Sequence, residues 1–299
     1  MTIHKPVLLN QVISGISPLS GKIVVDATFG GGGHSVALAQ EGAIVFSIDK
    51  DPLAIEEGER LLNQIACSGS KPHSLDPASF SFPSGGKIKL ASGQFSQIQK
   101  MAADFLPADA VLFDLGISSD QLSSKRGFSF GKDGPLDMRY NPDIQKVTAA
   151  DLLKILSQNQ LYEILTQFSQ EKHARAIAKA IVRQRSLKPI ETTLELSSLV
   201  SSIVPGGKIH PATRTFMALR IAVNSEFEEL QEGLNQAYLA IKSGGKILAI
   251  SFHSGEDRII KNFVRSHNLI PFKLIRPEQN EISQNPRARS AKLRIFVKP

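Results

Sequence analysis

One stretch of this sequence has the residue types and spacing for binding a nucleoside-like ligand. Residues 30–33 are four consecutive glycines, preceded by Asp26 and followed by His34. Glycine adopts positive φ angles at low cost and lets the backbone approach a ligand closely. Asp49 follows about 20 residues later, the spacing at which an acid accepts hydrogen bonds from ribose hydroxyls.

A strand, a turn, a helix and a second strand must position these residues. Residues 22–26 are rich in β-branched side chains, and residues 43–49 form a second apolar run that ends at Asp49. Between them, residues 35–40 place apolar side chains at helical spacing, and Gly42 can end that helix. Asp51 and Pro52 are suited to the N-cap and first turn of a further helix. The pattern predicts a nucleotide-binding βαβ unit.

The glycine pattern favours one class of ligand over another. A dinucleotide fingerprint needs a third glycine where this chain has Ser35, counted from Gly30, or Val36, counted from Gly31. The match to a nicotinamide cofactor is therefore poor. Asp26 suits a ligand with a positive charge and an amino-acid moiety, and S-adenosylmethionine has both. A purely structural glycine turn, with Asp49 as a solvated strand-end residue, remains an alternative.

Two further polar residues follow predicted strands. Asp114 ends the apolar run 109–114, and His253 follows the run 246–252. Ligands of open α/β sheets bind at the carboxyl ends of the strands, so both residues are candidates for chemistry. The alternatives are that Asp114 caps a loop, and that Ser254 with Asp257 forms a capping box that only starts a helix.

Composition restricts the class of protein. The chain has 299 residues, 41% of them hydrophobic, which predicts a globular protein with one large domain and a smaller insert. It has no apolar run suited to a membrane span or an export signal, so we expect a cytoplasmic protein. The single cysteine, Cys67, excludes an intramolecular disulfide and a cysteine-based zinc site, and no metal is expected.

The pattern of elements predicts an α/β protein with a helical insert. Strands are expected at 22–26, 43–49, 87–95 and 109–114, and again at 246–252, 272–276 and 293–298. Residues 148–204 show only helical patterns, and one long helix is expected from Thr213 to about Ile241. The predicted parts are therefore a first sheet segment at 1–124, a helical insert at 125–212 and a second sheet segment at 213–299. Residues 68–86 are expected to form a loop without a chemical role.

Positive charge suggests a polyanionic partner. The 35 Lys and Arg outnumber the 28 Asp and Glu, giving a net charge of +7. Basic residues cluster at 172–185, from 276 onward and at 285–294, where either phosphate contact or a solvated surface would explain them. The candidates for contact with a phosphate backbone are Arg126, Arg139, Arg214, Arg287 and Arg289.

Nine motifs spread in order over nearly the whole chain resemble those of one family. They are HKPVLL (4–9), DATFGGGGHS (26–35), DKDP (49–52), DLGISSDQL (114–122), RGFSF (126–130), GPLDMR (134–139), HPATRTF (210–216), SFHSGEDR (251–258) and NPRARS (285–290). The chain resembles the RsmH (MraW) family, bacterial methyltransferases that modify N4 of a cytidine in the decoding region of 16S rRNA. The resemblance implies a Rossmann-like S-adenosylmethionine-dependent methyltransferase fold, a helical domain that helps to recognise substrate, and 16S rRNA within the small ribosomal subunit as partner.

The resemblance also implies roles for particular residues. Gly32, Gly33 and His34 of the turn would contact the cofactor. Asp49 would bind the ribose, and Phe95 would lie near the adenine. Asp114 and Gln121 would lie beside the donor end. The chain departs from the family pattern at Gly31, Met217 and Gly255, and Gly255 is expected to loosen the start of the helix after His253.

Methyl transfer to an amino nitrogen needs help from the enzyme, because the nitrogen lone pair is delocalised into the base. We expect Asp114 to accept a hydrogen bond from the amino group, with His253 as the alternative proton acceptor. Three other functions remain open on sequence alone: a nicotinamide oxidoreductase, a non-catalytic RNA-binding or assembly protein, and a methyltransferase acting on another nucleic acid.

Overall fold

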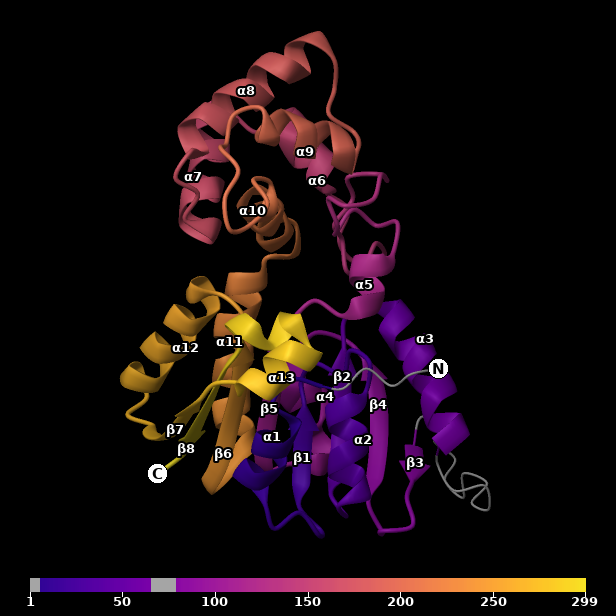
Figure 1. Cartoon of the computed structure of the whole chain (residues 1–299). Coiled ribbons are helices and arrows are strands. Elements are labelled where there is room, and N and C mark those ends of the chain that lie inside the picture. Colours follow the sequence, from indigo (N-terminus) through magenta and orange to yellow (C-terminus); the bar gives the residue numbers. More distant parts are fainter. Residues whose placement is uncertain (1–5, 66–78) are drawn as a thin grey trace. The chain divides into compact units, whose positions relative to one another are not determined.

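The computed structural model describes residues 6–65 and 79–299 and contains an eight-stranded sheet (Figure 1). The strands lie in the order β3-β4-β2-β1-β5-β6-β8-β7, in which β4, β2, β1, β5 and β6 are parallel. Their bounds are β1 Ile23–Asp26, β2 Ile44–Asp49, β3 Ser79–Ser81, β4 Lys87–Ser92, β5 Ala108–Asp114, β6 Ile241–Ser251, β7 Ile270–Ile275 and β8 Lys292–Val297. The strand order reverses between β1 and β5, where Rossmann-like sheets bind ligands. The predicted Rossmann-like α/β fold is confirmed.

Helices cover both faces of this sheet, because successive strand residues point to opposite sides. One core contains Val24 and Leu112 and is covered by α1 Leu9–Ile16, α2 Gly33–Gln40 and α3 Pro52–Ile65. The other contains Val25 and Phe113 and is covered by α4 Ile98–Met101, α11 Glu226–Ala240 and α12 Ser254–Ser266. The remaining elements of this part are α13 Gln279–Gln284 and the 3₁₀ turns η1 Phe95–Gln97, η2 Ala103–Phe105 and η3 Pro286–Ser290.

Two sequence predictions for this part were wrong. The predicted loop 68–86 contains β3, which pairs antiparallel with β4 and buries Phe80; residues 66–78 lie outside the described residues. The alternation Ser-Phe-Ser-Phe at 79–82 was the available signal. For residues 96–106, the apolar spacing that ends at Pro107 predicts a single helix. The structure has η1, α4 and η2 in that stretch instead.

The helical insert forms a compact unit with a core of its own (Figure 1). Its helices are α5 Ser119–Ser123, α6 Ala149–Ile155, α7 Gln158–Ser169, α8 Ala174–Leu187, α9 Thr193–Ser201 and α10 Thr213–Asn224. Capping boxes start α6, α7 and α9, at Thr148, Ser157 and Thr192. Each box satisfies backbone N–H groups that the first helical turn leaves unpaired, so these starts are encoded locally.

The boundaries of the two units differ from the predicted 125 and 212. One unit comprises Met1–Gly116 and Glu228–Pro299, and the other Ile117–Phe227. The long helix expected from Thr213 is divided at Ser225, which has a φ of 48°, so α10 and α11 are separate helices. The apolar face of α10, including Phe216 and Leu219, is buried in the core of the helical unit, and α10 therefore belongs to that unit.

No helix among the described residues is both long and apolar enough to span a bilayer.

Candidate functional site

The glycine turn joins β1 to α2 at the edge of the sheet where the parallel strands end. Gly30 and Gly32 have φ angles of 52° and 76°, a region that other residues adopt only with strain. Gly32 is the N-cap of α2, and Gly33 is its first residue. The sequence prediction of a βαβ unit with a glycine turn is confirmed, including Gly42 just after the helix, at a φ of 91°.

The ring of Phe29 explains why two glycines are needed beside it. A Cβ on Gly32 would lie 2.6 Å from this ring, and a Cβ on Gly58 in α3 would lie 2.3 Å from it. Phe29 is 3% exposed, so the ring has little room to move away. Gly31 differs, because a Cβ there would meet nothing within 4 Å. The turn is therefore packed against the Phe29 ring at Gly32 and has open space beside Gly31.

Asp49 ties the end of β2 to the glycine turn. Its Oδ2 accepts a hydrogen bond from the Gly30 N–H at 2.8 Å, and its Oδ1 accepts one from the Asp51 N–H at 2.9 Å. Removal from water raises the pKa of Asp49 to about 6, although both backbone donors act in the opposite direction. Each carboxylate oxygen has a further lone pair, so the group can accept two more hydrogen bonds while it is ionised.

Asp26 has a structural position, contrary to the expectation that it suits direct contact with a charged ligand. It is fully buried at the end of β1. Its Oδ2 accepts a hydrogen bond from the Ser35 hydroxyl at 2.5 Å, and its Oδ1 accepts one from the Thr28 N–H at 3.1 Å. Burial raises its pKa, and the Ser35 hydrogen bond opposes that shift. Asp26 fixes the path from β1 into α2, with Ser35 in turn bonded to Ser47 of β2 at 2.8 Å.

His34 and Asp114 lie next to each other, from the start of α2 and the end of β5. His34 Nε2 is 3.5 Å from Asp114 Oδ2, and His34 is only 5% exposed. Within the described residues, both ring nitrogens of His34 and Oδ1 of Asp114 are buried without a hydrogen-bond partner. Buried polar atoms are normally paired, so this set is suited to a polar ligand group. Sequence reasoning missed Thr28, whose hydroxyl accepts the Asp114 N–H at 2.6 Å and fixes the end of β5.

Phe95 follows β4 at the same edge of the sheet, since Ser92 of β4 pairs with Asp49 of β2. Its half-buried ring packs edge to face on Phe113, with centroids 5.5 Å apart. A Cβ on Gly233 of α11 would lie 2.3 Å from the Phe95 ring. The glycine therefore makes room for an aromatic side chain whose position is fixed from two sides.

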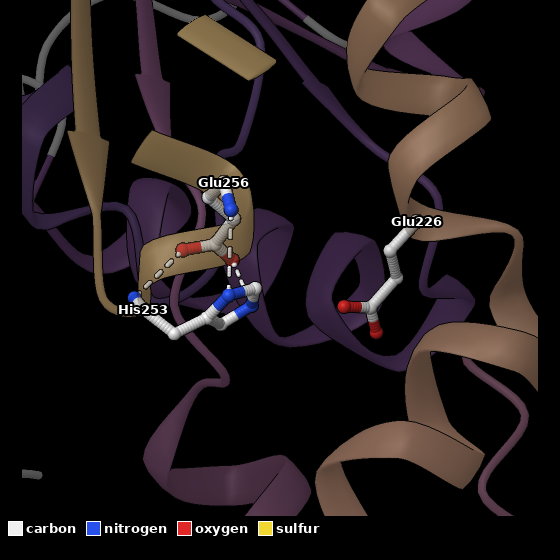
Figure 2. Close-up of side chains that lie close together, drawn as sticks. All are labelled: Glu226, His253 and Glu256. Atoms are coloured by element: carbon white, nitrogen blue, oxygen red, sulfur yellow. Dashed lines mark hydrogen bonds and ion pairs between the residues drawn. The ribbon is translucent and has the colours of Figure 1, made fainter. Parts of the chain in front are cut away.

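His253 is the N-cap of α12, directly after β6, and Glu256 completes the cap (Figure 2). Glu256 Oε2 accepts the N–H groups of Phe252 and His253 at 2.7 and 3.2 Å, and its Oε1 lies 3.0 Å from His253 Nε2. The capping pair is thus His253 with Glu256, and the predicted Ser254 with Asp257 was wrong. Asp257 instead binds Arg294 at 2.7 Å, which lowers its pKa against the effect of burial.

The third side chain in Figure 2, Glu226, belongs to the helical unit and is paired there. Arg220 donates to its two carboxylate oxygens at 2.8 and 2.9 Å, and the Tyr140 hydroxyl donates at 3.1 Å. Gln121 also lies in this unit, where its side chain accepts the Ser118 N–H in the cap of α5. The structure therefore brings together the glycine turn, Asp49, His34 and Asp114, and assigns Gln121 a local role in the other unit.

Three of the five arginines selected from the sequence make contacts inside the helical unit. Arg139 forms a two-pronged pair with Asp137, with both bonds at 2.7 Å. Arg126 donates to the Tyr140 carbonyl at 3.1 Å, and Arg214 to the Gln170 carbonyl at 3.3 Å. Arg287 and Arg289 are exposed on η3 in the sheet-containing unit.

The chain was compared with known proteins. The model of the MraW methylase family matches residues 1–299. Ribosomal RNA small subunit methyltransferase H of Ehrlichia chaffeensis is 40% identical, with 99% of each chain covered. The protein of that name from Persephonella marina is 41% identical, again with 99% of each chain covered. A crystal structure titled as a putative rRNA-methylase from Clostridium thermocellum is matched over 100% of both chains at 15% identity, with a TM-score of 0.47.

The packing of Phe29 predicts opposite outcomes for two neighbouring glycines. Gly32→Ala combines left-handed backbone strain with a clash against the ring, and we expect it to destabilise the protein by about 2 kcal/mol. This corresponds to a fall of about 4 to 8 °C in the midpoint of thermal unfolding. Gly31→Ala is the matched control and should leave the midpoint nearly unchanged. Equal midpoints for the two variants would contradict this account of the turn.

Proposed function

Because the chain belongs to the MraW methylase family over its full length, we propose that it methylates N4 of a cytidine in the decoding region of 16S rRNA. The chain is a methyltransferase, its methyl donor is S-adenosylmethionine, and its substrate is ribosomal RNA. The main support for this proposal is the match of the family model to residues 1–299. Relatives near 40% identity are named for small-subunit rRNA and support it further. Such a substrate also favours a cytoplasmic location.

The residues at the carboxyl edge of the sheet fit this donor. Asp49 has free lone pairs for the ribose hydroxyls, and Phe95 offers a fixed ring edge for the adenine. Gly32 and Gly33 provide the close backbone approach at the start of α2. The buried, unpartnered ring nitrogens of His34 suit the polar amino-acid end of the molecule, and Asp114 lies next to His34, beside the donor end. Gln121 remains a candidate for that end on family resemblance alone.

In the proposed reaction, Asp114 acts on the amino group of the cytidine. When bound, the donor would supply the methyl group and leave as a neutral thioether. N4 would gain the methyl group and give up one proton, which Asp114 would accept, with His253 as the alternative acceptor. By accepting a hydrogen bond from the amino group, Asp114 would return electron density to N4 and hold it in line for attack.

His253 is better suited to positioning than to proton transfer. Its backbone N–H and its ring both engage Glu256, which is 4% exposed. Asp114 of β5 pairs with Ile250 of β6, so His253 follows at the same edge of the sheet. We assign it the role of holding the start of α12, with proton acceptance as the alternative.

The test of this function is methyl transfer to ribosomal particles. Purified protein is incubated with methyl-labelled S-adenosylmethionine and small ribosomal subunits that lack the modification, and the RNA is digested to nucleosides. We expect label in N4-methylcytidine. Label in a different nucleoside would contradict the proposed target, and cofactor binding without any label would indicate another nucleic acid as acceptor.

The raised pKa of Asp49 predicts how cofactor binding depends on pH. Ribose hydroxyls need the ionised carboxylate, so affinity should be constant above pH 7 and decrease below the pKa of about 6. At pH 5 the dissociation constant should be about tenfold larger, since each pH unit below the pKa costs a factor of ten. Titration calorimetry with S-adenosylmethionine measures it.

The control for this prediction is Asp49→Asn, which cannot titrate. We expect weaker binding at pH 7 and little change between pH 5 and 7. A pH dependence that persists in this variant would assign the titration to another group.

The proposed role of Asp114 separates catalysis from cofactor binding. Asp114→Ala should lower kcat by about 100-fold or more, as expected for loss of an acid–base group, while cofactor affinity changes by less than about threefold. His253→Ala serves as the comparison: it should lower stability by about 1 kcal/mol through loss of the α12 cap, and have the smaller effect on kcat. If cofactor affinity collapses together with activity in Asp114→Ala, the residue binds the donor and does not act on the amino group.

A further inference from the structure

Helix α8 of the helical unit carries a face of uncommitted positive charge. Arg175, Lys179 and Arg183 are all exposed and spaced four residues apart. This spacing places them on one side of the helix, with a rise of about 6 Å between neighbours. We call these three residues the α8 cationic face. Lys172, also exposed, lies in the turn just before the helix.

The rest of α8 shows that this face is not needed for packing. The opposite side of the helix is buried through Ala174, Ile177, Ala178 and Ile181. The helix has no acidic residue, and its fourth cation, Arg185, donates to the Leu153 carbonyl instead. Within the part of the chain that the structure describes, no carboxylate forms an ion pair with the cationic face. The guanidinium of Arg175 lies 5.2 Å from the Tyr162 ring centroid, a cation–π contact that leaves its net charge in place.

The arginines of the sequence motifs in this unit, Arg126, Arg139 and Arg214, differ from the α8 cationic face in their contacts. Arg126, Arg139 and Arg214 use their donors on carbonyls or a carboxylate within the helical unit. They therefore have fewer donors left for an external phosphate. On α8, three aligned and exposed cations without a carboxylate partner among the described residues retain their charge for an external partner.

We propose that the α8 cationic face binds the phosphate backbone of the rRNA substrate. This inference rests on the proposed function for the identity of the RNA. Repulsion among three aligned cations destabilises the free helix slightly, since like charges at i,i+4 are unfavourable, and neutralisation by phosphates removes that cost. Contacts of this kind recognise backbone charge and position without reading sequence, so the cytidine is selected elsewhere.

The test compares two double variants that remove the same charge. Lys179→Ala/Arg183→Ala removes two members of the face, and alanine is the best helix former at both positions. Lys100→Ala/Lys154→Ala removes two exposed lysines from other helices, α4 and α6, and is the matched control. Equilibrium binding to a 16S rRNA fragment is measured from 50 to 200 mM salt, alongside cofactor affinity and methyl transfer.

We expect the face variant to bind RNA about tenfold more weakly at 100 mM salt, with unchanged cofactor affinity. Loss of two phosphate contacts should make the slope of log affinity against log salt shallower by about 1.4 to 1.8. The control should keep the wild-type slope. In methyl transfer, KM for RNA should rise while kcat at saturating RNA stays near the wild-type value.

Two results would overturn the inference. One is a face variant that binds and methylates RNA with the wild-type slope and KM. The other is a face variant that binds naked RNA as tightly as the wild-type protein does but binds intact subunits more weakly. That result would assign the face to contact with an acidic protein surface. Failure of the proposed function is distinguishable, because RNA binding that depends on α8 without any methylated cytidine would leave the inference standing and remove the function.

Discussion

The interaction on which the site depends is the pair of backbone hydrogen bonds to Asp49. One carboxylate holds the glycine turn through Gly30 and the start of α3 through Asp51. The carboxylate thereby joins the turn that follows β1 to the segment between α3 and β2, the strand paired with β1. The arrangement has a cost, because desolvation destabilises the ionised carboxylate of Asp49 and raises its pKa to about 6. A ligand that donates hydrogen bonds to the remaining lone pairs relieves that cost.

The three acids at the carboxyl edge of the sheet differ in their burial and in their hydrogen-bond partners within the protein. Asp26 and Asp49 each accept one hydrogen bond on each carboxylate oxygen. Asp26 is fully buried and is therefore part of the scaffold, whereas Asp49 is partly exposed and can accept further hydrogen bonds from a ligand. Asp114 has one oxygen with no partner among the described residues and the other 3.5 Å from His34. Among these three acids, Asp114 therefore has a buried oxygen left for a polar group of a ligand, as its proposed role requires.

Much of the fold was predictable because the signals are local. The glycine turn, the two flanking strands, the cap at Asp51 and the helices between 149 and 201 all follow from periodicity and capping residues, and the structure has them. The failures have tertiary causes. Burial of α10 in the helical core moved the domain boundary past 212, and pairing with β4 turned part of an expected loop into β3. The separate role of Asp26 depended on Ser35 approaching it, which spacing alone does not reveal.

The same distinction decides which charges can serve a partner. Sequence motifs direct attention to Arg126 and Arg139, yet the fold uses these side chains to hold its own turns. Arg139 is paired with the Asp137 carboxylate and Arg126 uses a donor on the Tyr140 carbonyl, so each has fewer donors left for RNA than an exposed cation without an acid nearby. The protein thus places fixed, directional charge where a small ligand must be held, and solvent-exposed charge on α8, where a backbone of varying shape can be held. Specificity and affinity for RNA would then come from different residues, because only the fixed groups have the geometry to discriminate among bases.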